Sequence, residues 1–132
     1  MSGLPPLAGP LQERTLEVQL ERHPAFLLMR VKGDLRLWNN ATAEEGLLRA
    51  FKSSLADSPK QLVLSLREVK YLDTCGIRAL VHLLVECARQ ETHLKVVLPP
   101  GVPGQALRYV RIFDHWPRFE DEAAAFQAAR AD

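Results

Sequence analysis

The chain has 132 residues, of which 47% are apolar, and this suits one domain of ordinary size with a single hydrophobic core. Its 17 Lys and Arg residues nearly balance its 16 Asp and Glu residues, so the formal net charge is only +1. No overall field draws the chain to nucleic acid or anionic lipid, and we expect neither as a partner. No stretch reaches the roughly 20 apolar residues of a membrane span, which argues against membrane insertion.

The N-terminus and the cysteines indicate the cellular context. Residues 1–13 contain three prolines and no cationic start to a secretion signal, so they predict a flexible leader before a domain at 14–132. Cys75 and Cys87 lie twelve residues apart on one expected helix, a rise of roughly 18 Å, which is too far for a disulfide. Reduced thiols and an unexported chain indicate a cytoplasmic protein.

The first part of the domain is typical of a β-hairpin. Residues 16–20 alternate apolar and polar side chains, as in a half-buried strand. The segment 21–24 supplies a turn into a second apolar strand at 26–31, which Gly33 is expected to end.

A helix and a central strand are expected next. Asn39 and Asn40 offer an N-cap, and the apolar residues that follow share one helical face, which predicts a helix near 41–56. Residues 58–60 break this helix. The continuous apolar run at 61–66 then predicts a short strand that is covered on both faces.

The clearest amphipathic pattern in the chain predicts a helix over 76–90. Its apolar residues recur at helical spacing and define an expected buried face: Ile77, Leu80, Val81, Leu84, Val85 and Ala88.

The last third predicts a strand at 94–98, a short helix at 105–110 and an edge strand at 113–119. Residues 120–122 open a terminal helix that is expected to dock through Ala123, Phe126 and Ala129. Strands and helices alternate with short loops, which predicts an α/β fold with one mixed sheet and about four helices.

The turn Asp73-Thr74-Cys75-Gly76 lies between the apolar strand and the amphipathic helix. A hydroxyl at such a junction lies beside unpaired N–H groups of the first helical turn, which attract negative charge. Thr74 is therefore a candidate phosphate carrier. The same pattern also fits Thr74 or Asp73 as a plain N-cap, and Gly76 as a residue that permits close packing.

With these elements in order, the chain resembles the STAS family, which includes the bacterial anti-sigma factor antagonists and domains of anion transporters. The matching segments are 62–66 and 71–80, with a weaker match at 33–35, and the likeness covers about residues 15–130. The resemblance implies a single STAS-like α/β domain. The family motif usually reads Asp-Ser-Ser-Gly or Asp-Ser-Thr-Gly, and a partner kinase phosphorylates the hydroxyl that follows the Asp.

Carried onto this chain, the resemblance implies that Thr74 is the phosphoacceptor. Gly76 is expected to begin the recognition helix, and Asp34 to lie in the adjacent loop. The implied partner-binding residues surround Thr74: Asp73, Cys75, Gly76, Ile77, Arg78, Asp34 and Arg36.

The implied partner is an anti-sigma factor that is also a serine/threonine kinase of the GHKL type. It would bind the protein while Thr74 is unphosphorylated and release its sigma factor. The chain departs from the family pattern at two positions, since Thr74 replaces the commoner Ser and Arg36 stands where antagonists often have Asp.

A second function stays open on the same resemblance. Small STAS proteins with Asp-Thr-x-Gly occur as cytosolic subunits of bacterial phospholipid-transport ABC complexes, where this turn and helix contact the ATPase. Neither the leader nor Arg36 separates the two functions. Co-purification with an ATPase rather than a kinase would decide between them.

Catalysis and metal binding have less support in the sequence. Cys75 lies near a helix N-terminus, where a thiol can become nucleophilic, but His82, the nearest candidate base, is about 10 Å further along the helix. The Cys and His residues have no spacing typical of a metal site. We therefore expect no catalytic residue, metal or cofactor. Trp38 and Trp116 are expected to pack at the ends of the sheet.

Overall fold

A five-stranded sheet runs through the centre of the structure, a computed structural model that describes residues 16–38 and 41–132. Its strands lie in chain order: β1 (Leu16–Arg22), β2 (Leu27–Leu35), β3 (Gln61–Leu72), β4 (His93–Val97) and β5 (Arg118–Phe119). β1 and β2 are antiparallel, which confirms the predicted hairpin. The other three neighbouring pairs are parallel.

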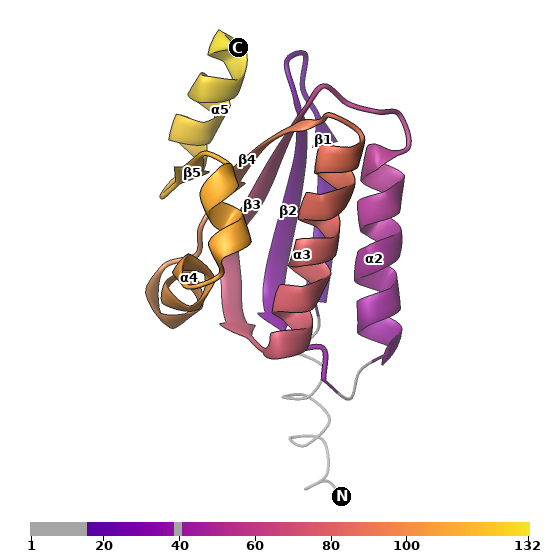
Figure 1. Ribbon diagram of the computed structural model, residues 1–132, viewed down its shortest axis with the longest axis vertical. Coiled ribbons are helices and arrows are strands. Elements are labelled where there is room, and N and C mark those ends of the chain that lie inside the picture. The colour runs from indigo at the N-terminus through magenta and orange to yellow at the C-terminus, as the bar shows by residue number, and fades with distance from the viewer. Residues whose placement is uncertain (1–15, 39–40) are drawn as a thin grey trace, which may run out of the picture.

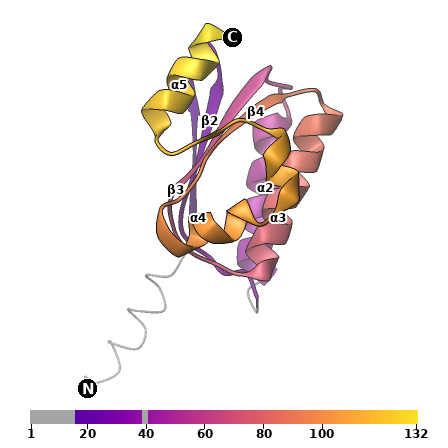
Figure 2. The same ribbon diagram turned by 60° about the vertical axis from the view of Figure 1, so that its left-hand side comes forward.

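Helices cover both faces of this sheet (Figure 1). They are α2 (Ala41–Leu55), α3 (Thr74–Arg89), α4 (Gly101–Arg108) and α5 (Glu122–Ala131), with a 3-10 helix at Arg111–His115. α2 and α3 lie side by side on one face, and α5 lies on the opposite face (Figure 2). The predicted α/β fold with a mixed sheet and about four helices is confirmed.

The core has two parts because the sheet is covered on both sides. The larger cluster lies between the sheet and the pair α2 and α3, and its fully buried members include Met29, Leu35, Leu64, Leu80 and Leu84. The smaller cluster lies under α5 and consists of Phe26, Leu28, Val63, Val97, Ala125 and Ala129. Side chains of β2 and β3 alternate between the two clusters, and residues 61–66 are all buried, as predicted for a strand covered on both faces.

α2 matches the helix predicted near 41–56. The two predicted N-cap residues, Asn39 and Asn40, lie outside the described residues, as does the leader at 1–13.

β2 and β3 are both longer than predicted. β2 continues past Gly33 to Leu35, and β3 continues past Leu66 to Leu72. Two register shifts occur along this pair, and the second follows Gly33, whose φ is +99°, a conformation that favours glycine. The extension keeps the backbone groups of both strands hydrogen-bonded, so polar side chains do not end the strands there.

The buried face of α3 is rotated relative to the predicted face. Leu80 and Leu84 are buried as expected, but Val85 is 46% exposed and Ala88 is also exposed. The actual buried residues are Gly76, Ala79, Leu80, Leu83, Leu84 and Cys87. α3 carries apolar residues over a broad arc, so two adjacent stripes fit the helical period, and packing against α2 and the sheet selects one.

The region after β4 differs most from the prediction. α4 begins at Gly101 rather than near 105, because Pro103 lies in the first helical turn, where a missing N–H costs no hydrogen bond. The predicted edge strand at 113–119 is wrong for most of its length, since only 118–119 form β5. α5 forms as predicted, but Ala123 is exposed and Ala125 takes its place in the core.

Candidate functional site

Asp73 lies between β3 and α3, and its carboxylate holds three segments together. Oδ1 accepts a hydrogen bond from the N–H of Gly76 at 2.8 Å, in the first turn of α3. Oδ2 accepts one from the N–H of Trp38 at 2.9 Å, in the segment that follows β2. The N–H of Asp73 itself donates to the carbonyl oxygen of Leu35 at 3.2 Å. Asp73 is therefore the N-cap of α3, an alternative that the sequence left open.

These hydrogen bonds also determine the charge of Asp73. Burial disfavours the carboxylate, but the N–H groups of Trp38 and Gly76, with smaller contributions from Leu37 and Cys75, outweigh it and hold the pKa of Asp73 below its usual value. A negative charge consequently lies next to Thr74 at neutral pH.

Thr74 is the first residue of α3, two residues earlier than the helix start predicted at Gly76. Its side chain is exposed, and the hydroxyl makes no hydrogen bond to any other residue that the structure describes. Because Asp73 caps the helix, the Thr74 hydroxyl is not needed for that role and remains accessible. The N-terminus of a long helix favours a nearby anion, so a phosphate on Thr74 is compatible with this position.

Gly76 brings α3 unusually close to β2. A Cβ atom at this position would lie 2.1 Å from the carbonyl oxygen of Leu35, which no side chain tolerates. The close packing that the sequence left open as a role for Gly76 is therefore present. Gly76 is buried, so it shapes the surface around Thr74 from below.

Comparison with known protein families decides the identity of the fold. A family model described as the STAS domain matches residues 17–125. This chain belongs to the STAS family. A search of curated proteins found no match.

Several solved structures similar to this STAS domain are anti-sigma factor antagonists. One, from Mycobacterium paratuberculosis, is 23% identical with a TM-score of 0.74, and the match covers 89% of this chain and 96% of that one. SpoIIAA in its unphosphorylated form is 15% identical with a TM-score of 0.64, over 88% and 100% of the two chains. The Bacillus SpoIIAA in its phosphorylated form is 12% identical with a TM-score of 0.62, over 85% and 99%. At these identities the likeness shows a shared fold.

The remaining predicted site residues of the STAS domain are not all on the surface. Arg36 is exposed, and its guanidinium carbon lies 4.0 Å from the ring centroid of Tyr71. Arg78 is also exposed, with Nη2 3.3 Å from a carboxylate oxygen of Glu44 in α2 and 3.6 Å from Sγ of Cys75. Ile77 is half-buried against the larger core cluster.

Asp34 does not lie in the loop where we expected it. It belongs to β2, opposite Tyr71 of β3, because β2 continues beyond Gly33. Its side chain is only 8% exposed, and Oδ2 has no hydrogen-bond partner in the described part of the chain. Asp34 is therefore buried within the sheet and is not part of an exposed loop.

Two aromatic residues close to the Asp73-Thr74 turn were not predicted as site residues. Trp38 is 71% exposed, so the expectation that it packs at a sheet end is wrong, whereas Trp116 packs half-buried against the core as expected. Tyr71 is 49% exposed beside Arg36. The sequence pattern predicts that an aromatic residue at the end of a strand is buried. Whether a neighbouring helix or strand covers its side chain depends on the tertiary structure.

The thiols and possible metal ligands can be placed for the described residues. Both cysteines are free, and burial raises the pKa of Cys87 to about 12, with a smaller effect from Glu86. Within 16–38 and 41–132, no group of His, Cys, Asp and Glu side chains could hold a metal ion. Over the same ranges, no helix is long and apolar enough to cross a membrane.

Proposed function

We propose that this STAS domain is an anti-sigma factor antagonist of the bacterial cytoplasm whose binding is switched by phosphorylation of Thr74. In the unphosphorylated state it binds an anti-sigma factor that is also a GHKL-type kinase. The observation that carries the proposal is the exposed Thr74 hydroxyl at the start of α3, freed from capping by Asp73. The anti-sigma factor antagonists among the similar structures support the same role, and they favour a binding module over an enzyme.

The contact surface in this proposal contains Thr74, the first turn of α3 and the segment 36–38. Asp73 fixes these parts relative to one another through its bonds to Trp38 and Gly76. A partner kinase can then meet a prearranged surface, which reduces the ordering cost of binding. Arg36, Cys75 and Ile77 lie within these segments, and Arg78 follows them on α3. Gly76 packs beneath the first turn against Leu35, and Asp34 is a buried residue of β2 in this proposal.

Phosphorylation acts on this surface through charge. A phosphate adds about −1.5 to −2 charges beside the Asp73 carboxylate. Burying that charge against a partner that does not pair it is costly, and about 1.4 kcal/mol already lowers affinity tenfold. The helix N-terminus accommodates the phosphate in the free protein, so release needs no refolding.

Affinity capture from the native lysate tests the proposal. The baits are the parent protein, Thr74→Ala, Thr74→Glu and the matched control Thr42→Glu, which adds the same charge to an exposed position in the first turn of α2. We expect a GHKL-type kinase on the parent, Thr74→Ala and Thr42→Glu baits, and at least about tenfold less on Thr74→Glu.

To detect phosphorylation itself, the parent protein and Thr74→Ala are incubated with the captured kinase and ATP. Peptide mass spectrometry then identifies the phosphorylated residue. Phosphate should appear on Thr74 in the parent and be absent from the variant. Equal capture by all four baits would contradict the switch, and capture of an ABC-transporter ATPase instead of a kinase would replace the proposal with the transport function.

A further inference from the structure

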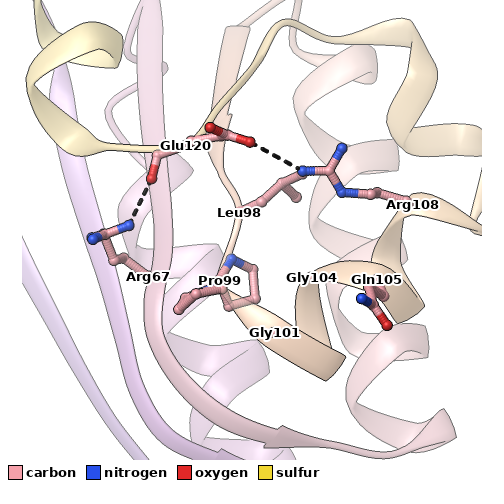
Figure 3. Close-up of a pocket in the computed structure, with 9 residues that line it drawn as sticks. Arg67, Leu98, Pro99, Gly101, Gly104, Gln105, Arg108 and Glu120 are labelled. Carbon is pink, nitrogen blue, oxygen red and sulfur yellow. Dashed lines mark hydrogen bonds and ion pairs between the residues drawn. The ribbon is translucent and has the colours of Figure 1, made fainter.

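Two hollows lie on opposite sides of α4 and share Pro100 and Gly101 at its N-terminal end. One, of about 510 Å³, lies between the end of β3 and α4. The other, of about 560 Å³, lies between the segment 98–100, α4 and Glu120 (Figure 3). We call the two together the α4 groove.

The α4 groove concentrates positive charge. Four exposed cationic side chains and one carboxylate line it: Arg36, Arg67, Lys70, Arg108 and Glu120. These leave an excess of three positive charges in a chain whose formal net charge is +1. The excess is therefore a local feature of this groove.

Most of these cations are weakly neutralised. Arg36 and Lys70 have no carboxylate within ion-pair distance in the described part of the chain. Arg67 donates to the backbone carbonyl of Glu120 at 2.7 Å, which uses no negative charge. Only Arg108 approaches the Glu120 carboxylate, at 3.5 Å (Figure 3). A ligand with negative charge can therefore pair with this groove without first breaking strong ion pairs.

Apolar side chains line the hollow between the end of β3 and α4 beside its two cations. Tyr71 and Val102 are 49% and 75% exposed, among the most exposed large apolar residues that the structure describes. Pro103 and Ala106 continue the same wall along α4. Covering such a wall removes apolar surface from water, which favours a ligand that carries apolar groups next to its charges.

We propose that the α4 groove binds an acidic segment of a partner protein, in which carboxylate side chains alternate with apolar ones. The carboxylates would pair with Lys70, Arg36 and Arg108, and the apolar side chains would cover Tyr71 and Val102. A nucleic acid fits less well, because its backbone would meet the Glu120 carboxylate and the aliphatic wall offers few rings for base stacking.

The α4 groove adjoins the Asp73-Thr74 turn through the end of β3. Leu72 lines the groove and directly precedes Asp73. One partner can therefore cover both surfaces, and the proposal rests on the docking function proposed above for the identity of that partner. The binding chemistry of the groove does not depend on Thr74, so the two can be tested separately.

NMR titration of the 15N-labelled protein tests the groove. The probe is a capped peptide, Ser-Glu-Leu-Glu-Ser-Leu-Asp-Ser, and its control has Gln and Asn in place of Glu and Asp. We expect amide shifts at Tyr71, Gly101, Val102 and Arg108, with the control peptide binding at least about tenfold more weakly. Added salt should weaken binding of the acidic peptide, because exposed charges are screened.

Two double variants that each remove two positive charges test whether the peptide binds at the groove. Lys70→Gln/Arg108→Gln should weaken the peptide about tenfold, whereas Arg49→Gln/Lys52→Gln, which removes two exposed cations from α2, should leave it unchanged. Three results would overturn the proposal. They are amide shifts that lie outside the groove, binding of the Gln/Asn peptide as tight as that of the acidic peptide, and tighter binding of oligothymidylate than of the acidic peptide at the same amides. If the peptide does not bind the groove but Thr74→Glu still weakens kinase capture, the groove proposal is wrong and the proposed function is supported. If the peptide binds the groove but the Thr74 variants capture the kinase equally, the groove proposal is supported and the switch is wrong.

Discussion

A Cβ atom on Gly76 would lie 2.1 Å from the carbonyl oxygen of Leu35, so the first turn of α3 touches β2 at a position with no room for a side chain unless the backbone shifts. This contact determines how far α3 stands from the sheet. It therefore also determines where Thr74 is presented relative to the segment 36–38.

Gly76→Ala should destabilise the fold by about 2–3 kcal/mol, because either α3 or β2 must move to relieve the overlap. Gly46→Ala is the matched control, since the added methyl group would meet no described atom within 4 Å apart from its own chain neighbours and the backbone of α2. That variant should gain about 0.5–1 kcal/mol from helix propensity. Urea unfolding followed by circular dichroism measures both, and equal effects of the two substitutions would show that the close approach is unimportant.

Asp73→Ala removes the N-cap of α3 and the link to Trp38, and should cost about 1–2 kcal/mol at pH 7. The folded-state pKa of Asp73 is lowered, so its contribution is complete above the ordinary carboxyl pKa and is lost as the pH falls through the folded value. The stability difference between parent and variant should therefore shrink below about pH 4.

Asp121→Ala is the comparison for Asp73, because Asp121 caps α5 through a similar bond to the N–H of Ala124 at 2.8 Å. It should cost a similar amount of stability but leave the signals of Trp38 and Thr74 in an NMR spectrum unchanged. If Asp73→Ala also left those signals in place, Asp73 would not organise the site.

Glu122 ties α5 to the sheet through two partners. Its carboxylate accepts from Arg30 at 2.7 and 2.9 Å and from the hydroxyl of Ser65 at 2.6 Å. The Arg30 bonds, the Ser65 bond and nearby positive charge hold the pKa of Glu122 below its usual value despite burial. Glu122→Ala should cost about 2–3 kcal/mol at pH 7, since it leaves Arg30 and buried Ser65 without this partner.

The pH dependence of this effect follows from the lowered pKa of Glu122. The contribution is present above the ordinary carboxyl pKa and disappears as acid protonates the folded form. Glu45→Ala, on an exposed position of α2, should change stability by less than about 0.5 kcal/mol at any pH. Thermal unfolding of the parent, Glu122→Ala and Glu45→Ala at pH 7 and pH 3 measures these effects. If Glu122→Ala lowers the stability by the same amount at both pH values, the ion pair of Glu122 with Arg30 does not account for the loss.

Cys87 should resist alkylation in the folded protein. Its side chain is fully buried, and its pKa is raised to about 12, so almost no thiolate is present at pH 7. Cys75 is half-buried and should react first. Mass spectrometry after iodoacetamide treatment should find one label in the native protein and two in urea. Labelling of Cys87 at the rate of Cys75 without denaturant would mean that α3 does not pack as described.

Sequence reasoning anticipated the site better than its surroundings. The Asp-Thr-Cys-Gly turn is local, so its position between a strand and a helix could be inferred from the apolar runs on either side. The burial of Asp34 and the exposure of Trp38 could not be, because both depend on β2 extending past Gly33. The contact of Glu122 with Arg30 was equally hidden, since it joins residues far apart in the chain.

The sequence by itself determined the order and type of the main elements, the α/β class and the position of the Thr74 turn, because hydrophobic period and capping chemistry act over a few residues. Only the tertiary structure decided which stripe of α3 is buried, how far β3 extends and that the cations beside α4 gather in one groove. Those features depend on contacts between segments distant in sequence, where packing and backbone pairing outweigh local preference.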